Sequence, residues 1–165
     1  MVIRRAKARD LADLEVLMEQ AAEGLGPEIF CRDSRDYLAA HLAGQGFILV
    51  AEDSGALCGM MMARFPYLAE DNLGWDLAWS EERLKQVCHM ESLAVHPYWR
   101  GQGLQRALLS AAESKTAEMY RYWLATVAPA NGVSLRNFYR MGYAVVAQKK
   151  KYGGYDRYIL LKNRP

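Results

Sequence analysis

Apolar residues fall along the chain in short runs and in helical spacings, separated by breaks rich in glycine, proline or charge. Runs of strand length predict strands at residues 2–6, 47–52, 56–65, 87–95, 122–128, 143–151 and 156–162. Apolar residues three or four positions apart predict helices that begin after Asp10 and at Ser34, Gly103 and Asn131. Asp10 is a suitable N-cap for the first of these helices, because its side-chain oxygens can accept a hydrogen bond from a free backbone N–H.

The order of these elements indicates an α/β protein with a mixed, mostly antiparallel sheet and about four flanking helices. Asp53-Ser54-Gly55 predicts a hairpin turn between the second and third strands. The helix that begins at Gly103 links strand 87–95 to strand 122–128, and such a crossover makes two strands parallel neighbours. The chain has 165 residues, of which 52% are hydrophobic, so we expect one domain over residues 1–165.

Charge and hydropathy exclude two classes of partner. The formal net charge is +2, and the one basic run, Lys149-Lys150-Lys151, is interpreted as a solvated strand end, so we expect no nucleic-acid partner. No apolar stretch approaches bilayer-spanning length, and the first residues resemble a strand and a helix rather than a signal peptide. We therefore expect a cytoplasmic protein with no membrane partner.

The cysteines do not predict a disulfide framework or a metal site. Cys31, Cys58 and Cys88 are odd in number and lack the spacing of metal ligands. We interpret them as buried free thiols in preference to a catalytic nucleophile, and we expect no metal.

A glycine loop before the third predicted helix indicates an anion site. Arg100-Gly101-Gln102-Gly103-Leu104 follows an apolar strand and leads into an alanine-rich helix. The first turn of a helix leaves backbone N–H groups unpaired, and glycine lets a phosphate approach them closely. The loop is neither a dinucleotide fingerprint, which would need glycine at Arg106, nor a P-loop, since no lysine is followed by serine or threonine there.

The loop resembles the acyl-CoA-binding signature of the GNAT superfamily of N-acetyltransferases, and the resemblance covers nearly the whole chain. The matching pieces are, in order, Ile3-Arg4-Arg5-Ala6, Asp10, Glu91-Ser92-Leu93-Ala94-Val95, Arg100-Gly101-Gln102-Gly103, Asn131, Ser134 and Phe138-Tyr139-Arg140-Met141-Gly142-Tyr143. The resemblance implies a fourth and a fifth strand that splay apart, with the acyl-pantetheine arm of acetyl-CoA between them. One departure is Gln105, which stands where the signature ends on Gly or Ala, and its larger side chain can narrow the diphosphate site or add a hydrogen bond.

The same resemblance implies which residues contact acetyl-CoA. The diphosphate is expected on the loop and the first turn of the helix, at Arg100, Gly101, Gln102, Gly103, Leu104 and Gln105. The pantetheine arm is expected along Leu93, Ala94 and Val95, with main-chain contacts at Leu93 and Val95, and near Asn131, Ser134 and Phe138. Asn131 is also a suitable N-cap for the last helix.

Acetyl transfer to an amine needs a group that accepts the amine's proton, since an alkyl ammonium has a pKa of about 10.4. Glu91 is the first candidate, because strand alternation places it on the same face as Leu93 and Val95. An alternative of equal weight is that Glu91 pairs with an arginine such as Arg64 across the sheet. His89, two residues earlier on the same face, is the second candidate, although a lone strand histidine is more often a core residue.

A proton donor for the departing thiolate is harder to assign. The resemblance implies a tyrosine four residues before Gly142, but Phe138 stands at that position and Tyr139 is one residue later. One residue on a regular helix turns a side chain by about 100°. Either the helix end is rewound and Tyr139 is the acid, or the thiolate leaves without a protein acid. The second route is possible because a thiol with a pKa of about 8.5 gives a tolerable leaving group.

Segment 65–79 is long for a connection between neighbouring strands, and it carries Trp75, Trp79 and several acids. It can recognise a cationic amine by charge and aromatic contact. The alternative, which we favour, is a short amphipathic helix with the two tryptophans stacked against the body and the acids in water.

The sequence therefore predicts an N-acetyltransferase that moves an acetyl group from acetyl-CoA to a primary amine, of a small molecule or a protein, by direct attack through a tetrahedral intermediate. One alternative is a non-catalytic acyl-CoA sensor of the same fold, and another is a protein-interaction domain that does not bind CoA. The sequence leaves open whether the protein is a monomer or a homodimer.

Overall fold

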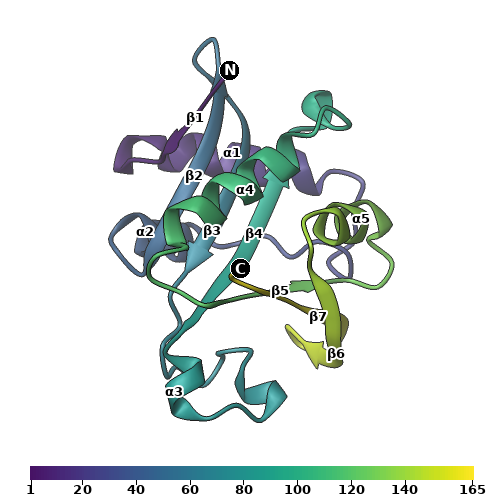
Figure 1. Ribbon diagram of the computed structural model, residues 1–165. Helices are drawn as coiled ribbons and strands as arrows, with labels where there is room; N and C mark the ends of the chain where they lie inside the picture. The colour runs from purple at the N-terminus through teal and green to yellow at the C-terminus, as the bar shows by residue number, and fades with distance from the viewer.

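In a computed structural model, which describes residues 1–165, the chain forms a seven-stranded mixed sheet flanked by helices (Figure 1). The strands are β1 (Val2–Arg5), β2 (Gly46–Asp53), β3 (Ala56–Arg64), β4 (Val87–Val95), β5 (Tyr122–Val127), β6 (Ala144–Lys151) and β7 (Tyr155–Asn163). The helices are α1 (Leu11–Ala22), α2 (Arg35–Leu42), α3 (Glu81–Leu84), α4 (Leu104–Thr116) and α5 (Gly132–Arg140). The one-turn helix α3 is an addition to the predicted set.

The strands lie in the order β1-β2-β3-β4-β5-β7-β6. Every neighbouring pair is antiparallel except β4 and β5, which are parallel and are joined through α4. This arrangement confirms the predicted mixed sheet and its crossover.

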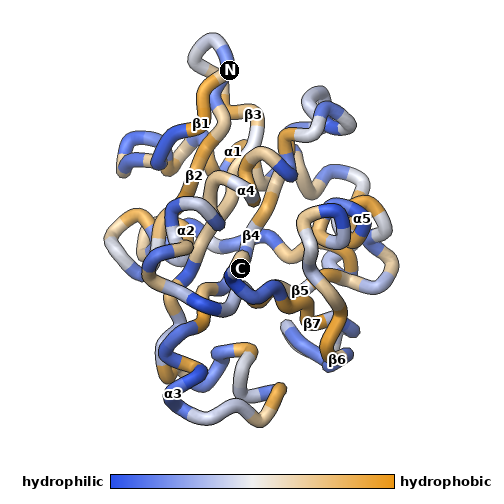
Figure 2. The backbone as a smooth tube through the Cα atoms, viewed as in Figure 1, coloured by the Kyte–Doolittle hydropathy of each residue, from blue (hydrophilic) through white to orange (hydrophobic).

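Two layers of helices bury the two faces of the sheet. Helices α1 and α2 cover one face, where their apolar residues pack on alternate side chains of β2 and β3, among them Ile48, Met60 and Met62. Helix α4 covers the opposite face, over Leu49, Met61 and other side chains, and α5 joins this second cluster. In Figure 2 hydrophobic residues predominate along β2 and much of β4, whereas many hydrophilic residues lie on the helices and connections around the sheet. None of the helices has the length and apolar character that a membrane crossing requires.

The role of Asp10 differs from the prediction. Asp10 precedes α1, but its carboxylate makes no capping bond to that helix. It accepts a hydrogen bond from the Lys7 backbone N–H at 2.7 Å and forms two with the Arg4 guanidinium, at 2.8 and 3.0 Å. The hydrogen bonds from Arg4 lower the pKa of Asp10. A nearby arginine on β1 therefore takes the carboxylate that the helix N-terminus would otherwise bind.

Strands β4 and β5 pair only where they begin. Their register runs from Val87 and Tyr122 to His89 and Leu124, after which both strands continue without pairing to each other. Figure 1 shows the two strands diverging beyond this point. The structure thus has the splayed parallel pair that the sequence resemblance implied.

A β-bulge changes the side of the sheet to which Glu91 points. Met61 pairs with Leu93 and Ala63 pairs with Met90, so β4 has one more residue than β3 in this stretch. The extra residue reverses the alternation, and Leu93 packs with the α4 side of the sheet while Glu91 contacts Tyr37 of α2 on the other side. The prediction that Glu91 shares a face with Leu93 and Val95 was therefore wrong.

Candidate functional site

A row of adjoining cavities follows the gap between β4 and β5, and we call it the cleft. At one end it is bordered by the start of α4 and by α5, and at the other by the loop before α3. Neighbouring cavities share lining residues, Val95 and Gln105 near α4 and Glu91, Thr126 and Tyr152 farther along. The cleft therefore forms one path across the carboxyl ends of the two strands.

The α4 end of the cleft has the properties of a phosphate cradle. None of the backbone N–H groups from Gly101 to Arg106 donates a hydrogen bond to another protein atom. Gly101 and Gly103 have φ angles of 77° and 79°, a region that favours glycine, and Gly103 is the N-cap of α4. An anion at this helix end would receive several N–H groups and the favourable end of the helix dipole.

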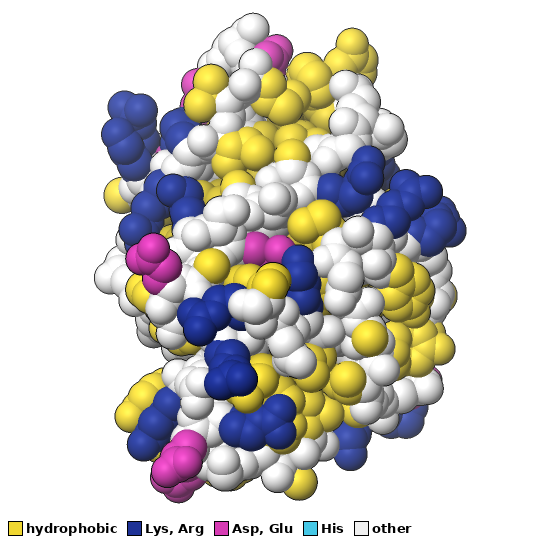
Figure 3. All heavy atoms as spheres, in the orientation of Figure 1, with side chains coloured by type: hydrophobic (Ala, Val, Ile, Leu, Met, Phe, Trp, Pro, Cys, Tyr) yellow, Lys and Arg dark blue, Asp and Glu magenta, His cyan; other side chains and the backbone are white.

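Four arginines line the cavity beside this cradle, at positions 100, 106, 136 and 140. The sequence analysis proposed only Arg100, whose guanidinium also donates to the Ala21 carbonyl at the end of α1, at 2.9 Å. Arg136 and Arg140 are one turn apart on α5, which places them on the same side of that helix. Lys and Arg side chains gather at the right of the face shown in Figure 3, near the start of α4 and near α5.

The main chain of β4 is free to pair with a ligand where β5 has diverged. The His96 N–H donates to the Cys58 carbonyl of β3 at 2.9 Å. Because backbone groups alternate between the two edges of a strand, the N–H groups of Leu93 and Val95 point to the opposite edge, toward the cleft. Ala94 is buried against the α1 side of the sheet and also borders the cleft.

Gln105 connects α4 to α5 at the side of the cleft. Its Nε2 donates to the Ser134 hydroxyl at 3.1 Å, and its Oε1 accepts from Asn137 Nδ2 at 2.6 Å. Asn131 accepts the Ser134 backbone N–H at 3.1 Å, which confirms its predicted role as the N-cap of α5. Gln105, the residue that departs from the signature, therefore holds α5 in position beside the phosphate cradle.

The two other predicted residues of this region differ in burial. Leu104 is buried, while Gln102 is exposed and donates to the Tyr98 carbonyl at 3.2 Å.

Glu91 lies in the middle of the cleft, where several groups hold its carboxylate. Tyr37 donates a hydrogen bond of 2.5 Å to Oε2, and Arg64 Nη1 lies 3.5 Å from Oε1. The pairing with Arg64 that the sequence allowed is thus present, and Arg64 also binds Asp71 through two hydrogen bonds of 2.8 Å. A carboxylate held in this way is oriented toward the cavity that it lines.

Asp33 is a second carboxylate in the same cavity, and the sequence analysis did not single it out. Burial is the main cause that raises its pKa to about 6, and the negative charge of Glu91 adds to this effect. Its Oδ2 atom is buried with no hydrogen-bond partner. A carboxyl group with a pKa near 6 can accept a proton at neutral pH more readily than an ordinary aspartate can.

His89 is placed as a structural residue. Its side chain is 3% exposed, and its Nε2 accepts the Leu73 backbone N–H at 3.1 Å. Burial and the nearby Arg64 lower its pKa to about 3, so the ring is neutral and a weak base at neutral pH. The structure therefore does not support the second base candidate.

The loop between β3 and α3 is folded against the start of β4. Trp79 packs against the body as predicted: its ring lies 4.9 Å from the ring of Tyr122 on β5, and the guanidinium carbon of Arg83 lies 3.9 Å from its centroid. Trp75 is 42% exposed and donates to the Ala69 carbonyl at 3.0 Å. Two of its acids are bound within the chain, since Asp71 pairs with Arg64 and Asp76 pairs with Lys151. These two acids are therefore paired and not free, although Asp71 stays exposed, and Glu70 is exposed to water as expected. The loop closes the far end of the cleft.

The structure does not bring Tyr139 into the cleft. Helix α5 continues in regular form to Arg140, so the side chain of Tyr139 points away and is 48% exposed. Phe138 is buried, lines the cleft and packs edge to face on Tyr143. The phenol that does line this part of the cleft belongs to Tyr152, whose hydroxyl lies 2.8 Å from the Thr126 hydroxyl.

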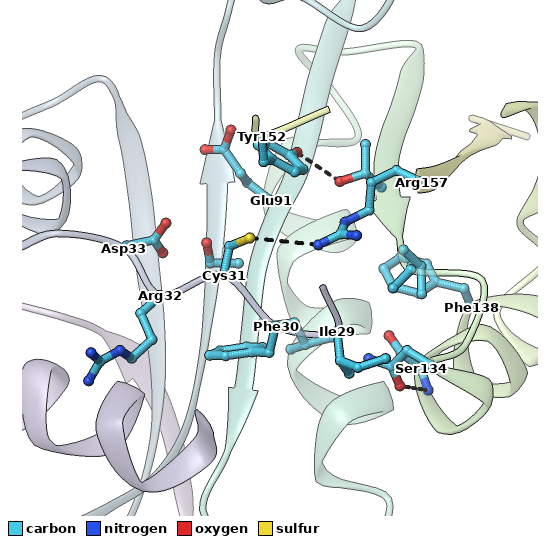
Figure 4. A pocket seen from close by; sticks show the side chains of 16 residues that line it. Ile29, Phe30, Cys31, Arg32, Asp33, Glu91, Ser134, Phe138, Tyr152 and Arg157 are labelled. Atoms are coloured by element: carbon cyan, nitrogen blue, oxygen red, sulfur yellow. Dashed lines mark hydrogen bonds between the residues drawn. The ribbon is translucent and has the colours of Figure 1, made fainter. Parts of the chain in front are cut away.

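The three cysteines are free, as expected, but they differ in burial. Cys58 and Cys88 are buried in the core, whereas Cys31 is exposed and lines the cleft beside Arg157 (Figure 4). The expectation of a buried thiol was wrong for Cys31, because the connection from α1 to α2 borders the cavity. No group of three or more His, Cys, Asp or Glu side chains is arranged to hold a metal ion.

Comparisons with known proteins agree with this geometry. The model of the acetyltransferase (GNAT) family matches residues 12–143. No curated protein sequence matches the chain.

Solved structures share the fold at low sequence identity. One is a phosphinothricin acetyltransferase of Sinorhizobium meliloti in complex with acetyl-CoA, with 19% identity, a TM-score of 0.74 and coverage of 99% of this chain and 88% of that one. Another is the ribosomal-protein-S18-alanine N-acetyltransferase of Escherichia coli, with 14% identity, a TM-score of 0.74 and coverage of 99% and 93%. A third is an N-acetyltransferase of Staphylococcus aureus, with 17% identity, a TM-score of 0.75 and coverage of 99% and 98%. These likenesses show a common fold.

Proposed function

The chain belongs to the GNAT acetyltransferase family, and from this we propose that it transfers an acetyl group from acetyl-CoA to a primary amine. The observation that carries the proposal is the row of unpaired backbone N–H groups from Gly101 to Arg106, at one end of a cleft that also contains two carboxylates. Such a cleft can hold a long, polyanionic donor at one end and an amine at the other.

In this proposal the cradle and its arginines hold the phosphates of acetyl-CoA. The N–H groups of Leu93 and Val95 pair with the pantetheine arm, and Asn131, Ser134 and Phe138 border it. The fit rests on the free N–H groups and on the positive-φ glycines, which leave the approach to the main chain open. Acetyl-CoA supplies an activated acetyl thioester.

The carboxylates of Glu91 and Asp33 act on the amine. The ammonium form is attracted to them, and Glu91, directly or through water, accepts the proton that makes the amine a nucleophile. The nitrogen then attacks the acetyl carbonyl, a C–N bond forms, and the tetrahedral intermediate collapses with cleavage of the C–S bond. The excess proton on the nitrogen passes through water to the departing thiolate, which gives a neutral amide and free CoA thiol. An N–H group of β4 that points into the cleft stabilises the oxyanion, and the thiolate leaves without a donor at Tyr139.

A cytoplasmic location is part of the proposal. It is supported by the three unpaired cysteines, since free thiols persist in reducing compartments.

Titration calorimetry with acetyl-CoA, followed by release of free thiol with a panel of amines, tests the proposed function. Saturable binding with thiol release that depends on the amine supports the transferase. Binding without release across amines and peptides would instead favour a non-catalytic acyl-CoA-binding protein. Absence of binding would contradict both.

A further inference from the structure

Arg157 of β7 is a buried cation in the part of the cleft where the proposed function places the acceptor amine. It is 4% exposed and lines the same cavity as Glu91 and Asp33. Nη1 donates to the carbonyls of Glu28 at 2.7 Å and Asp156 at 2.8 Å. Nη2 has only long contacts, 3.4 Å to the Pro27 carbonyl and 3.6 Å to the Cys31 sulfur.

No carboxylate of the protein neutralises this charge. Every polar partner of Arg157 is a backbone carbonyl or a thiol, and its other neighbours are the rings of Tyr152 and Tyr155, at 5.5 and 5.7 Å. The other buried or half-buried cations of the cleft, Arg64 and Lys151, each pair with an acid. Burying a charge without a counterion is unfavourable, and a neutral donor could bind the same carbonyls without that penalty.

One edge of the Arg157 guanidinium is available to a ligand. Nε donates to no protein atom, and the Arg157 side chain lines the cavity, so this N–H group can bind a ligand in the cleft. Nε and Nη2 form the side edge of a guanidinium, whose two parallel N–H groups match the two oxygens of a carboxylate.

We propose that Arg157 binds a carboxylate of the acceptor, so that the substrate is an amino acid or a similar amine that also carries a carboxylate. This inference rests on the proposed function and specifies its substrate class. Figure 4 shows the Arg157 side chain on one side of the cavity and the carboxylates of Asp33 and Glu91 on the other. A molecule with a carboxylate at one end and an ammonium at the other matches this separation of charge. Cys31, next to Arg157, is covered when the carboxylate binds.

The first test compares matched acceptors in the wild-type protein. Thiol release is measured with glycine, β-alanine and 4-aminobutyrate and with the carboxamide of each, so that the carboxylate charge is removed at constant chain length within a pair, and rates are compared per concentration of free amine. We expect at least one carboxylate to have a kcat/KM at least tenfold above that of its carboxamide. In Arg157→Gln this ratio falls close to one, while the affinity for acetyl-CoA is unchanged. Arg164→Gln is the matched control, because Arg164 also binds a backbone carbonyl but lies outside the cleft.

The second test does not depend on turnover. Alkylation of Cys31 by iodoacetamide is followed by mass spectrometry in the presence of each compound. We expect at least one of the carboxylates to slow alkylation in the wild type and not in Arg157→Gln, and we expect the carboxamides not to slow it. If the rates of thiol release are equal within every pair of carboxylate and carboxamide, the inference is overturned. It is also overturned if the preference for the carboxylate persists in Arg157→Gln. Neither result contradicts the proposed acetyltransferase activity. If no compound releases thiol, the result counts against the proposed function. If the carboxylates also fail to protect Cys31 from alkylation, the proposed carboxylate site at Arg157 is overturned as well.

Discussion

The Tyr37 hydroxyl lies 2.5 Å from the Glu91 carboxylate and joins helix α2 to the middle of β4. Burial and the charge of Glu91 raise the pKa of Tyr37, so the phenol stays protonated and donates this hydrogen bond. The bond and Arg64 keep Glu91 in one orientation within the cleft. A proton acceptor that is already oriented loses little freedom when the amine binds, which favours catalysis.

Replacing Glu91 by glutamine tests its role as the proton acceptor. The amide has nearly the same shape but cannot take the proton, and general-base catalysis typically contributes about 100-fold or more. We expect kcat of Glu91→Gln to fall by about 100-fold while the Kd for acetyl-CoA, measured by calorimetry, stays unchanged. Glu118→Gln, at an exposed position, is the control. A variant with wild-type kcat would show that Glu91 only balances Arg64.

Gly103→Val tests the phosphate cradle. A β-branched residue is strained at a φ of 79°, and its side chain would stand where the phosphates approach the free N–H groups. We expect the Kd for acetyl-CoA to rise by at least 100-fold. Gly55→Val, in the β2–β3 turn with a φ of 85°, carries the same backbone strain away from the cleft. If both variants bind acetyl-CoA equally well, the loop is not the phosphate site.

Arg136→Gln and Arg140→Gln test the basic cavity on α5. Hydrogen bonds from a charged donor contribute about 1.5–3 kcal/mol each, so either change should weaken acetyl-CoA binding by about tenfold or more. The dependence of Kd on salt concentration should become shallower in the same variants. Calorimetry at two ionic strengths measures both effects, with the exposed Arg9→Gln as the control. Unchanged affinity and salt dependence would show that these arginines do not contact the phosphates.

The features of the site that were predicted correctly, a glycine loop and a helix N-cap, are those that depend on residues close together in the sequence. The glycine loop at Gly101 and Gly103 and the N-cap at Asn131 depend on neighbouring residues, so a short stretch of sequence shows them. Glu91 was placed in the cleft, but the face was wrong, because the bulge in β4 depends on its register with β3.

Long-range contacts determined what the sequence could not show. Arg157 alternates with its neighbours as an ordinary strand residue, and its importance appears only when residues 27–31, far away in the sequence, fold around it. Asp33 lies in the connection between α1 and α2, and it comes beside Glu91 of β4 only in the folded chain. Tyr139 was proposed from the family pattern, and the regular end of α5 turns it away from the cleft.

Asp33 gives the protein a pH dependence of stability that can be measured apart from activity. Its pKa is about 6 in the folded protein, mainly because of burial, and about 3.9 in an unfolded chain. Between these values the folded state binds more protons than the unfolded state. The contribution of Asp33 to the free energy of unfolding therefore falls as the pH rises from about 4 to about 6, and the loss persists at higher pH.

Asp33→Asn removes the ionisation and with it this penalty. We expect the Tm of Asp33→Asn, relative to the wild type, to be higher at pH 7.5 than at pH 4, as measured by calorimetric unfolding at both values. Glu118→Gln should show no such change, since its side chain is exposed. A Tm difference that is independent of pH, or one that is larger at pH 4, would mean that Asp33 is ionised in the folded protein across this range. The carboxylate would then be a weaker proton acceptor than its burial beside Glu91 implies.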